Sequence, residues 1–404
     1  MWDADVVIVG AGASGLSLAY RLAAPAPRHG QGALMSVALV DAPAGPLRPA
    51  ERTWCFWEEP GGEYDRALAG SWHRLRITGA DGEAVVGRPA PLRYKMIRSG
   101  AFEAMVDERL GRSSCVRHEA TVESVHDRPG GAEVRGRDAN GREVRLRARW
   151  VFDSRPPRRL PPARTTLLQH FRGWFVRTEQ PVFEVGVADL MDFRTPQPGH
   201  GLSFGYVLPL GPREALVEYT EFSRTVLDDE AYDRALRHYT ADVLGLGPGL
   251  GRGNLTVTAT EQGVIPMTDA RFPHRAGRSV FLIGAAGGAT RPSTGYTFSA
   301  VQRHTRAIAD ALLSGRPPRV RPPHPLRART LDAVFLRALD TGRVSGAAFF
   351  AKLFREVPTE RLLRFLDGCT GWHEDFLIGL HTPVRPMLRT VAELPWVSRR
   401  PPAG

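Results

Sequence analysis

The sequence predicts an α/β fold with a parallel-sheet lobe, an inserted antiparallel-sheet lobe and a helical C-terminal region. Three observations predict it. A glycine-rich turn lies between a strand and a helix within residues 5–24, strand patterns follow one another through 165–262, and apolar positions recur at helical spacing through 328–390. With 404 residues, the chain is long enough for two or three lobes.

Composition excludes several classes of protein. Hydrophobic residues make up 42% of the chain, which rules out a disordered composition. The formal charge of +11 comes almost entirely from arginines, which are spread over every segment. Because nucleic-acid binding needs a basic face or stripe, we expect no nucleic-acid partner. A basic surface would also suit an anionic membrane.

The three cysteines form no CxxC pair, which argues against a disulfide framework and against a zinc site. We therefore expect no metal and a reducing, cytoplasmic environment. The N-terminal flank is acidic, with Asp3 and Asp5, whereas a signal peptide has a basic flank. No stretch approaches the ~18 apolar residues of a membrane-spanning helix.

The first element is a glycine-rich turn, Gly10-Ala-Gly12-Ala-Ser-Gly15, directly after the apolar strand 5–9. Gly10 permits the tight turn, Gly12 lets a pyrophosphate approach the backbone, and Gly15 lets helix and strand pack closely. The N–H groups and dipole of the helix that follows favour a phosphate. The alternative is a glycine-rich turn without a ligand.

A second strand, 36–40, ends at Asp41, whose carboxylate is predicted to bind ribose hydroxyls. Asp41 lies further from the turn than the usual ~20 residues because the loop 25–33 is long. A strand, a glycine turn, a helix and a second strand ending in an acid together predict a Rossmann-type dinucleotide-binding unit.

Two later segments favour FAD over NAD. A predicted strand ends at Asp153, and another ends before Gly284, followed by a turn that contains Gly295. Both strand ends are expected near the cofactor, with the flavin ring close to 284–295. Each segment alone could be an ordinary strand-to-helix turn, but their order along one chain favours the cofactor interpretation.

The intervening elements complete the predicted division. Residues 43–70 look irregular but aromatic, 99–110 predict a helix, and 115–153 predict a β-meander. We expect four units: 1–164, the first part of the FAD-binding domain; 165–262, an antiparallel-sheet substrate domain; 263–315, the last part of the FAD-binding domain; and 316–404, a linker and helical C-terminal region.

Several strings, in order along residues 1–310, resemble the lycopene cyclase family, specifically the bacterial lycopene β-cyclase type. A generic flavin monooxygenase is not expected to share the strings in the middle of the chain. They are ERTWCFWE (51–58), YKMIRS (94–99), VFDSRP (151–156), LLQHFRGWFV (167–176), LMDFRTPQ (191–197), SFGYVLPL (203–210), LVEYTEFS (216–223), EQGVIPMTD (261–269) and GAAGGATRPSTGYTF (284–298).

The resemblance implies a flavoprotein fold related to p-hydroxybenzoate hydroxylase and geranylgeranyl reductases. It implies FAD acting in reduced form, NADPH as reductant, and lycopene or a related acyclic carotenoid as substrate, cyclised to β-rings without net redox change. Arg98, in the second string, is expected to contact the cofactor. Gly284-Ala285 departs from the Gly-Asp pair common in flavoproteins, so the ribityl contact must come from another residue or from the backbone.

The family's catalytic string, FLEET in plant-type members, matches Leu216-Val-Glu218-Tyr219-Thr220 here. Glu218 matches the first glutamate and is the predicted acid, whereas Tyr219 replaces the second, whose role cannot be carried over. Alternation places Glu218 on one strand face with Leu216 and Thr220. Burial in an apolar pocket would keep its carboxyl protonated. The alternatives are a solvent-facing Glu218, or Glu221 as the acid.

Aromatic side chains are predicted to line the substrate pocket because their faces stabilise a carbocation in a dry site. Any single one could equally be part of the core. The candidates are Trp54, Phe56, Trp57, Trp174, Phe204, Tyr206 and Tyr296.

Two other functions stay open. One is a redox enzyme on the same fold, a flavin monooxygenase or polyprenyl reductase, and the other is a non-catalytic carotenoid- or flavin-binding protein. Ring type, the number of ends cyclised and the oligomeric state are not predicted.

Residues 328–366 are expected to provide a peripheral membrane-docking face, since they combine apolar positions at helical spacing with basic side chains. The alternative is that these helices pack on the protein's own sheet. The basic residues are Arg337, Arg343, Lys352, Arg355, Arg361 and Arg364.

Overall fold

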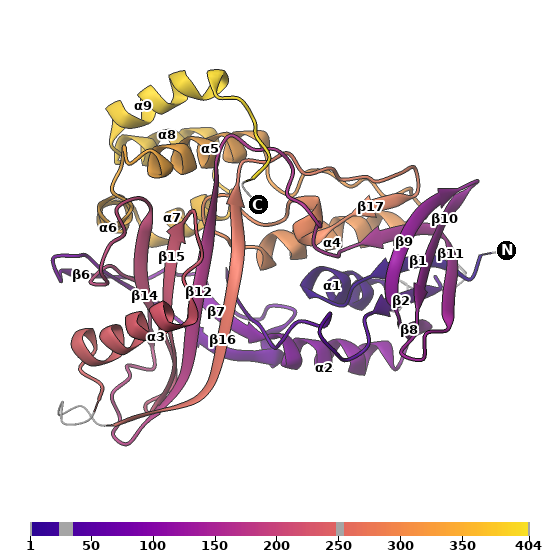
Figure 1. Cartoon of the computed structure of the whole chain (residues 1–404), viewed down its shortest axis with the longest axis horizontal. Coiled ribbons are helices and arrows are strands. Elements are labelled where there is room, and N and C mark those ends of the chain that lie inside the picture. The colour runs from indigo at the N-terminus through magenta and orange to yellow at the C-terminus, as the bar shows by residue number, and fades with distance from the viewer. Residues whose placement is uncertain (1, 24–34, 248–253, 403–404) are drawn as a thin grey trace.

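The computed structural model describes residues 2–23, 35–247 and 254–402. A parallel sheet lies at one end of the molecule and a long antiparallel sheet lies towards the other, with helices between them and above them (Figure 1). The predicted loop 25–33 lies outside the described residues. This arrangement confirms the predicted fold class.

The first sheet holds the strand–turn–helix–strand unit. Its strands β8, β2, β1, β11 and β17 run parallel, and β10 and β9 extend it antiparallel from the first half of β11. Helices α1, α2 and α4 cover the face turned towards the antiparallel sheet (Figure 1). The bounds are β1 Ala4–Val9, α1 Ala13–Leu22, β2 Val37–Asp41, α2 Ser99–Leu110, β8 Cys115–Glu119, β9 Thr121–Arg128, β10 Gly131–Arg137, β11 Glu143–Asp153, β17 Val280–Leu282 and α4 Phe298–Leu313.

The second sheet has the order β16-β12-β15-β14-β13-β5-β6 and is antiparallel except between β13 and β5. Strands β5 and β6 precede residue 164, so the sheet of the predicted 165–262 unit also takes strands from the predicted first unit. The domain boundaries stay a prediction. The bounds are β5 Arg74–Thr78, β6 Ala84–Gly87, β12 Thr166–Thr178, β13 Val187–Asp192, β14 Leu202–Gly211, β15 Glu214–Ser223 and β16 Leu255–Thr268.

Residues 43–70, expected to be irregular, contribute one strand and the start of another to a third, three-stranded sheet. It consists of β3 (Thr53–Glu58), β7 (Arg93–Arg98) and β4 (Leu68–Trp72), with β7 in the centre. Strand β3 contributes side chains to two different cores, with Trp57 in one and Phe56 in the other. Because both faces are apolar, TWCFWE lacks the polar–apolar alternation by which a half-exposed strand is recognised.

The C-terminal region is helical, as expected. Helices α5, α6 and α7 bury Phe335, Phe350 and Leu363 in the same core as the second sheet. The opposite face of that sheet is covered by α3 (Asp229–His238) and a π-helical turn (Tyr239–Val243). The bounds are α5 Leu326–Asp340, α6 Gly346–Glu356, α7 Thr359–Leu366, α8 Trp372–Leu380 and α9 Val384–Glu393.

Candidate functional site

The carboxyl ends of the parallel strands meet at one edge of the first sheet. Val9 of β1 is in register with Val40 of β2 and with Asp153 of β11, and Asp153 is in register with Leu282 of β17. The segments after these four strands therefore start side by side, which is where open α/β sheets bind ligands.

The glycine turn at this edge leaves room on its outer side. Gly10 has φ +93°, a conformation that favours glycine. A β-carbon at Gly15 would lie 1.8 Å from the carbonyl oxygen of Gly10, so only glycine fits there. A β-carbon at Gly12 would meet no atom within 4 Å. The turn is therefore closed against the sheet at Gly15 and open towards solvent at Gly12.

Polar groups around this opening lack partners among the described residues. The N-cap of α1, Gly12, offers no side chain to the first-turn N–H groups, and the hydroxyl of Ser14 is buried without a hydrogen bond. Gly284, with φ +65°, approaches Ser14 so closely that a β-carbon would lie 2.9 Å from the serine β-carbon. Free N–H groups, an unused hydroxyl and close glycine backbones fit the pyrophosphate of a dinucleotide.

The two acidic residues at this edge, Asp41 and Asp153, differ in their hydrogen-bond partners and in their position relative to the glycine turn. Asp41 accepts a hydrogen bond from the Ala11 N–H at 3.2 Å, and its other oxygen lies 3.5 Å from Arg117. Asp153 is buried, and its carboxylate forms an ion pair with Arg155 at 2.7 Å. Asp41 also lies 3.9 Å from Arg48, so both carboxylates are ion-paired within the chain. Asp41 differs in lying directly beside the glycine turn, where the ribose of a bound dinucleotide would lie.

Gly295 and Arg98 lie further along, next to the second sheet. Gly295 has φ +73°, and a β-carbon there would lie 2.2 Å from Oε1 of Gln169 on β12. This Oε1 is buried and has no hydrogen-bond partner among the described residues. Arg98 forms an ion pair with Glu51, and its guanidinium stacks 4.6 Å from the ring centre of Phe175. The described contacts of Arg98 therefore lie away from the glycine turn.

Glu218 points from β15 into the core between the sheets. It is in register with Gly173 of β12 and with Tyr206 of β14, and the residue is only 8% exposed. The Thr220 hydroxyl donates to its Oε1 at 2.6 Å. Burial, together with the nearby charge of Glu261, raises the pKa of Glu218 to about 8, against the lowering effect of Thr220.

Glu261, which the sequence analysis did not single out, provides a second carboxyl beside Glu218. Both glutamates are in register with Gly173, from opposite sides of β12. A β-carbon on Gly173 would lie 3.3 Å from Cγ of Glu261 and 3.6 Å from Cβ of Glu218, so the glycine leaves the space in which the two side chains approach each other. The Thr53 hydroxyl donates to Glu261 at 2.7 Å, and burial raises the pKa of Glu261.

One signal could have revealed Glu261. It is the only charged residue in β16, and it stands at the start of EQGVIPMTD, one of the strings that carried the family resemblance. Its closeness to Glu218 depends on the register of β16 on β12, which includes a bulge at Phe175/Val176. That register cannot be read from the sequence of either strand.

Aromatic and hydroxyl groups surround the carboxyl pair. The hydroxyls of Tyr206 and Tyr94 lie 2.5 Å apart, and those of Tyr94 and Tyr296 lie 3.0 Å apart. Trp57 stands edge-on to Tyr296, with ring centres 4.6 Å apart. Burial raises the pKa of the Cys55 thiol beside them to about 12, so the thiol is uncharged. The cluster supplies ring faces and neutral hydroxyls without adding a charge.

The structure brings together only part of the predicted aromatic set. Trp57, Tyr206 and Tyr296 lie with Glu218, and Phe204 lies on the same face of the sheet, in the same core. Trp54 and Phe56 do not, because they stack on Phe298 of α4, on the opposite side of β3.

Trp174 also lies away from the pocket. It is in register with Val217, one residue before Glu218, and packs with the residues under α3 on the other face of the sheet. Glu221 lies on that same face, where it accepts a hydrogen bond from the Tyr219 hydroxyl at 3.0 Å. Strand alternation therefore separates both Trp174 and Glu221 from Glu218.

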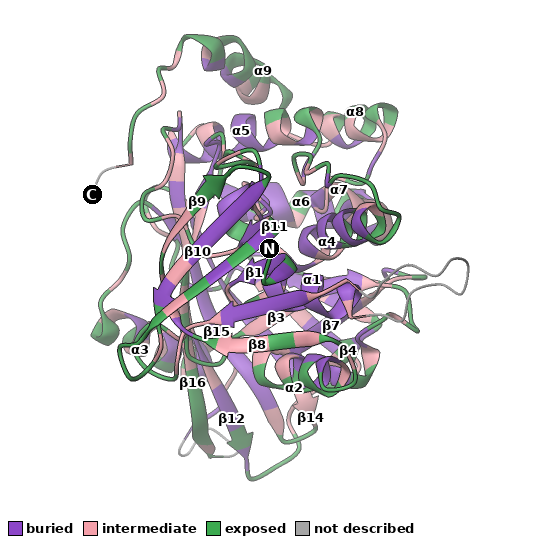
Figure 2. Ribbon diagram, turned by 90° about the vertical axis from the view of Figure 1, so that its right-hand side faces the viewer, coloured by how far each residue is buried: buried purple, intermediate pink, exposed green. Residues whose placement is uncertain are grey.

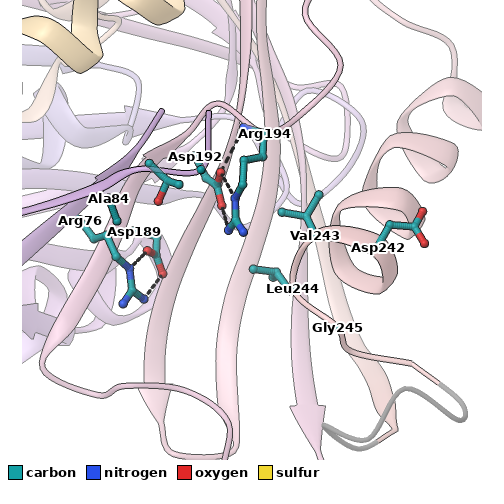
Figure 3. A pocket seen from close by; sticks show the side chains of 11 residues that line it. Arg76, Ala84, Asp189, Asp192, Arg194, Asp242, Val243, Leu244 and Gly245 are labelled. Atoms are coloured by element: carbon teal, nitrogen blue, oxygen red, sulfur yellow. Dashed lines mark hydrogen bonds and ion pairs between the residues drawn. The ribbon is translucent and has the colours of Figure 1, made fainter. Parts of the chain in front are cut away.

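A surface cavity of about 450 Å³ lies elsewhere, between β5, β13 and the segment that follows α3 (Figure 3). Its two arginines are neutralised: Arg76 pairs with Asp189, and Arg194 pairs with Asp192. A polar cavity with paired charges fits neither a hydrocarbon nor an additional anion. It shares no lining residue with the glycine turn or the carboxyl pair.

Comparison with solved structures defines the class of fold. The chain resembles a flavoprotein/dehydrogenase from Cytophaga hutchinsonii (12% identity, 97% of this chain and 99% of that one, TM-score 0.65). It also resembles the p-nitrophenol 4-monooxygenase PnpA from Pseudomonas putida DLL-E4 (16% identity, 98% of this chain and 99% of that one, TM-score 0.60). A third similar structure is a geranylgeranyl bacteriochlorophyll reductase-like protein from Thermoplasma acidophilum (14% identity, 96% of each chain, TM-score 0.57). The fold is therefore that of this group of flavoproteins.

Comparison with protein-family models gives a more specific assignment than the fold. The family model described as lycopene cyclase protein matches residues 5–392, nearly the whole chain. The protein belongs to the lycopene cyclase family, and the resemblance inferred from the sequence strings is confirmed. No curated protein matches the chain.

Proposed function

We propose that this protein is a lycopene β-cyclase that uses reduced FAD and protonates its substrate with Glu218. The observation that carries the proposal is the buried Glu218 carboxyl, whose pKa is raised to about 8 on a face lined by aromatic rings. Protonation of an alkene needs an acid that stays protonated at neutral pH, and a hydrocarbon needs a pocket without hydrogen-bonding demands.

The cofactor assignment is supported by the fit of the glycine turn. Gly10, Gly12 and Gly15 would hold the pyrophosphate at the N-terminus of α1, Asp41 would bind ribose, and Gly284 and Gly295 would flank the flavin ring. The last two lie on the segment that also carries Tyr296, so the ring would sit near the aromatic cluster. When bound and reduced, with NADPH as the electron source, FAD would supply electron density near a developing cation.

The acid–base work falls to this chain's own side chains. The Glu218 carboxyl gives its proton to the terminal double bond of an acyclic end, and a second double bond closes the six-membered ring. The ring cation then gives a proton back to the ionised carboxyl pair, which leaves the β-ring and restores the acid. The faces of Trp57, Tyr206 and Tyr296 would stabilise the cation by about 2 kcal/mol or more each when desolvated. Proton gain and loss balance, so the product is an isomer of the substrate.

Glu261 is proposed as the partner that keeps Glu218 protonated. Two carboxyls that share a site cannot both ionise freely, so the pair retains a proton at a higher pH than either group would alone. Thr53 and Thr220 each donate a hydroxyl to one carboxyl and so fix the pair. Tyr219, in place of the family's second glutamate, lies on the other face, and Glu261 provides the missing carboxylate from a different strand.

Reduced protein incubated anaerobically with lycopene, FAD and NADPH tests the function. We expect a product of the same mass as lycopene that contains β-rings. A product heavier by hydrogen would identify a reductase, and a requirement for oxygen would identify a monooxygenase. Tight binding of lycopene without conversion would identify a binding protein, and any of these three results would overturn the proposal.

The proposed substrate also implies contact with lipid, since lycopene has no polar group and dissolves in bilayers. No described helix is long and apolar enough to cross a membrane. The three cysteines are free thiols, which fits a reducing compartment. We therefore propose a cytoplasmic enzyme that binds the membrane surface from one side.

A further inference from the structure

The helices expected to dock on lipid, within residues 328–366, are occupied by the protein itself. Phe349, Phe350 and Leu353 of α6 are buried in the core of the second sheet. The basic side chains pair with acidic ones; for example, Arg355 contacts Glu83 at 3.1 Å and Arg364 contacts Glu374 at 2.6 Å. This segment is therefore packed as an ordinary amphipathic layer, and the expected docking face does not lie there.

The exposed apolar surface lies instead on the next helix, α8. Trp372, Phe376 and Leu380 follow one another at intervals of four residues, and they are 77%, 63% and 55% exposed. This spacing places them on one side of the helix. Ile378, on the other side, is 1% exposed and belongs to the core.

Helix α9 repeats the arrangement. Val384, Leu388 and Val391 form an exposed stripe, whereas Thr390 is buried and Met387 packs inward. The short turn after α9 carries Trp396, which is 87% exposed. Both views place α8 and α9 at the same end of the molecule as α5, with α9 outermost, and Figure 2 shows many exposed residues along both helices (Figures 1 and 2).

The unpaired charges on this surface have one sign. The carboxylates of α8 and α9 are neutralised from beneath: Glu374 by Arg364, Asp375 by Arg327, and Glu393 by Arg337 at 2.6 Å. Arg385 and Arg389 of α9 are exposed, and neither forms an ion pair with a described residue. The free charge beside the apolar stripes is therefore positive.

We propose that α8, α9 and Trp396 form a docking surface for a lipid bilayer that contains anionic headgroups. Apolar stripes suit the boundary between headgroups and acyl chains, exposed tryptophans prefer that interface, and unpaired arginines attract anionic lipid. Helix α9 packs on α5, and α8 is joined to α5 by the ion pair of Asp375 with Arg327. Because α5 packs against the sheet that carries Glu218, the surface is continuous with the lobe that holds the site. The inference deepens the proposed function, on which it rests for the hydrocarbon substrate.

Cosedimentation of the full chain with vesicles tests the surface without any substrate, so its result is independent of cyclase activity. We expect tighter binding to vesicles of phosphatidylcholine with phosphatidylglycerol than to phosphatidylcholine alone. Replacing both arginines (Arg385→Gln, Arg389→Gln) should weaken binding to anionic vesicles by about 30-fold. The control variant Arg112→Gln, Arg137→Gln removes equal charge at exposed sites of the other lobe and should change binding by less than about 3-fold.

A second pair of variants tests the apolar stripes. Phe376→Ser with Leu388→Ser should weaken binding to both kinds of vesicle, whereas Leu47→Ser with Val116→Ser, at exposed apolar sites elsewhere, should not. Brominated lipids should quench tryptophan fluorescence in the parent and do so less in Trp372→Phe, Trp396→Phe. Circular dichroism confirms that each variant is folded.

Two results would overturn the proposal. One is equal vesicle binding by the parent and by both α8–α9 variants. The other is that the parent is a dimer without lipid, that the Phe376→Ser, Leu388→Ser variant is a monomer, and that both bind vesicles equally. The surface would then be an interface between two copies of the chain. If the vesicle results hold but lycopene is not cyclised, the docking surface stands and the proposed substrate fails.

Discussion

Replacing Glu261 by glutamine should move the alkaline limit of activity to lower pH. The variant keeps the shape of the side chain and its bond to Thr53 but removes the negative charge that raises the pKa of Glu218. Glu218 then ionises more easily, so the fraction that can donate a proton falls at a lower pH. Glu261 acts through Glu218 in this account and is a positioning residue.

The size of the expected pH shift follows from the pKa of Glu218 and from the spacing of the strands that carry the two carboxyls. With a pKa of about 8, the protonated fraction of Glu218 falls from about nine-tenths at pH 7 to about one-tenth at pH 9, so the parent's kcat/KM should fall about 10-fold over that interval. The backbones of Glu218 and Glu261 lie on either side of β12, two strand spacings or about 10 Å apart along the sheet. Because the two side chains approach each other over Gly173, this spacing gives a minimum for the effect. At an effective dielectric constant of about 20, a unit charge at that distance contributes roughly 1.7 kcal/mol, which moves the limit by about one pH unit.

The assay is kcat/KM for lycopene in neutral vesicles between pH 6 and pH 10, because neutral lipid keeps docking independent of headgroup titration. Glu221→Gln is the matched control: its carboxyl is on the same strand as Glu218 but on the opposite face, bonded to Tyr219. We expect the limit to shift only in Glu261→Gln. An unshifted limit in that variant, a shift to higher pH, or an equal shift in Glu221→Gln would refute the role of the carboxyl pair.

Three further predictions concern the cofactor turn and stability. Gly12→Val should fold normally but lose FAD binding, measured by flavin fluorescence, because the new side chain fills the open space that the pyrophosphate would occupy. Gly15→Ala should instead destabilise the fold, because the new β-carbon meets the Gly10 carbonyl oxygen. Asp332→Ala should lower the free energy of unfolding by about 3–5 kcal/mol in urea, because it leaves Arg291 buried without its partner. Glu218→Gln should be more stable than the parent at pH 9 and equally stable at pH 4: the raised folded-state pKa costs the parent about 1.4 kcal/mol per pH unit between about pH 4.5 and pH 8.

The parts of the site that depend on local sequence could be predicted. The turn of Gly10, Gly12 and Gly15 is determined by backbone requirements within a few residues, and the alternation of β15 correctly placed Glu218 with Leu216 and Thr220 on one face. Burial of the run VVIV (6–9) follows from its composition alone.

The parts of the site that depend on pairing between distant strands could not be predicted from the sequence. The sequence predicts that Trp54, Phe56 and Trp57 all line the pocket, but β3 lies between two cores and divides them. Trp174 was assigned to the pocket because the facing direction of a strand with apolar residues on both sides cannot be read from its sequence. Glu261 was missed because only the register of β16 on β12 brings it near Glu218. Likewise, α6 and α8 both carry apolar residues at helical spacing, and only their burial distinguishes a core helix from a docking helix.

The most direct test of the account is anaerobic cyclisation of lycopene in deuterium oxide, followed by mass spectrometry of the product. An exchangeable carboxyl such as that of Glu218 would add a deuteron to carbon, while the proton released on ring formation comes from the substrate. The account predicts one deuterium for each β-ring formed by the parent and no cyclic product above about one-hundredth of that amount from Glu218→Gln. Cyclic product without deuterium, or near-parent cyclisation by Glu218→Gln, would contradict the assignment of Glu218 as the acid.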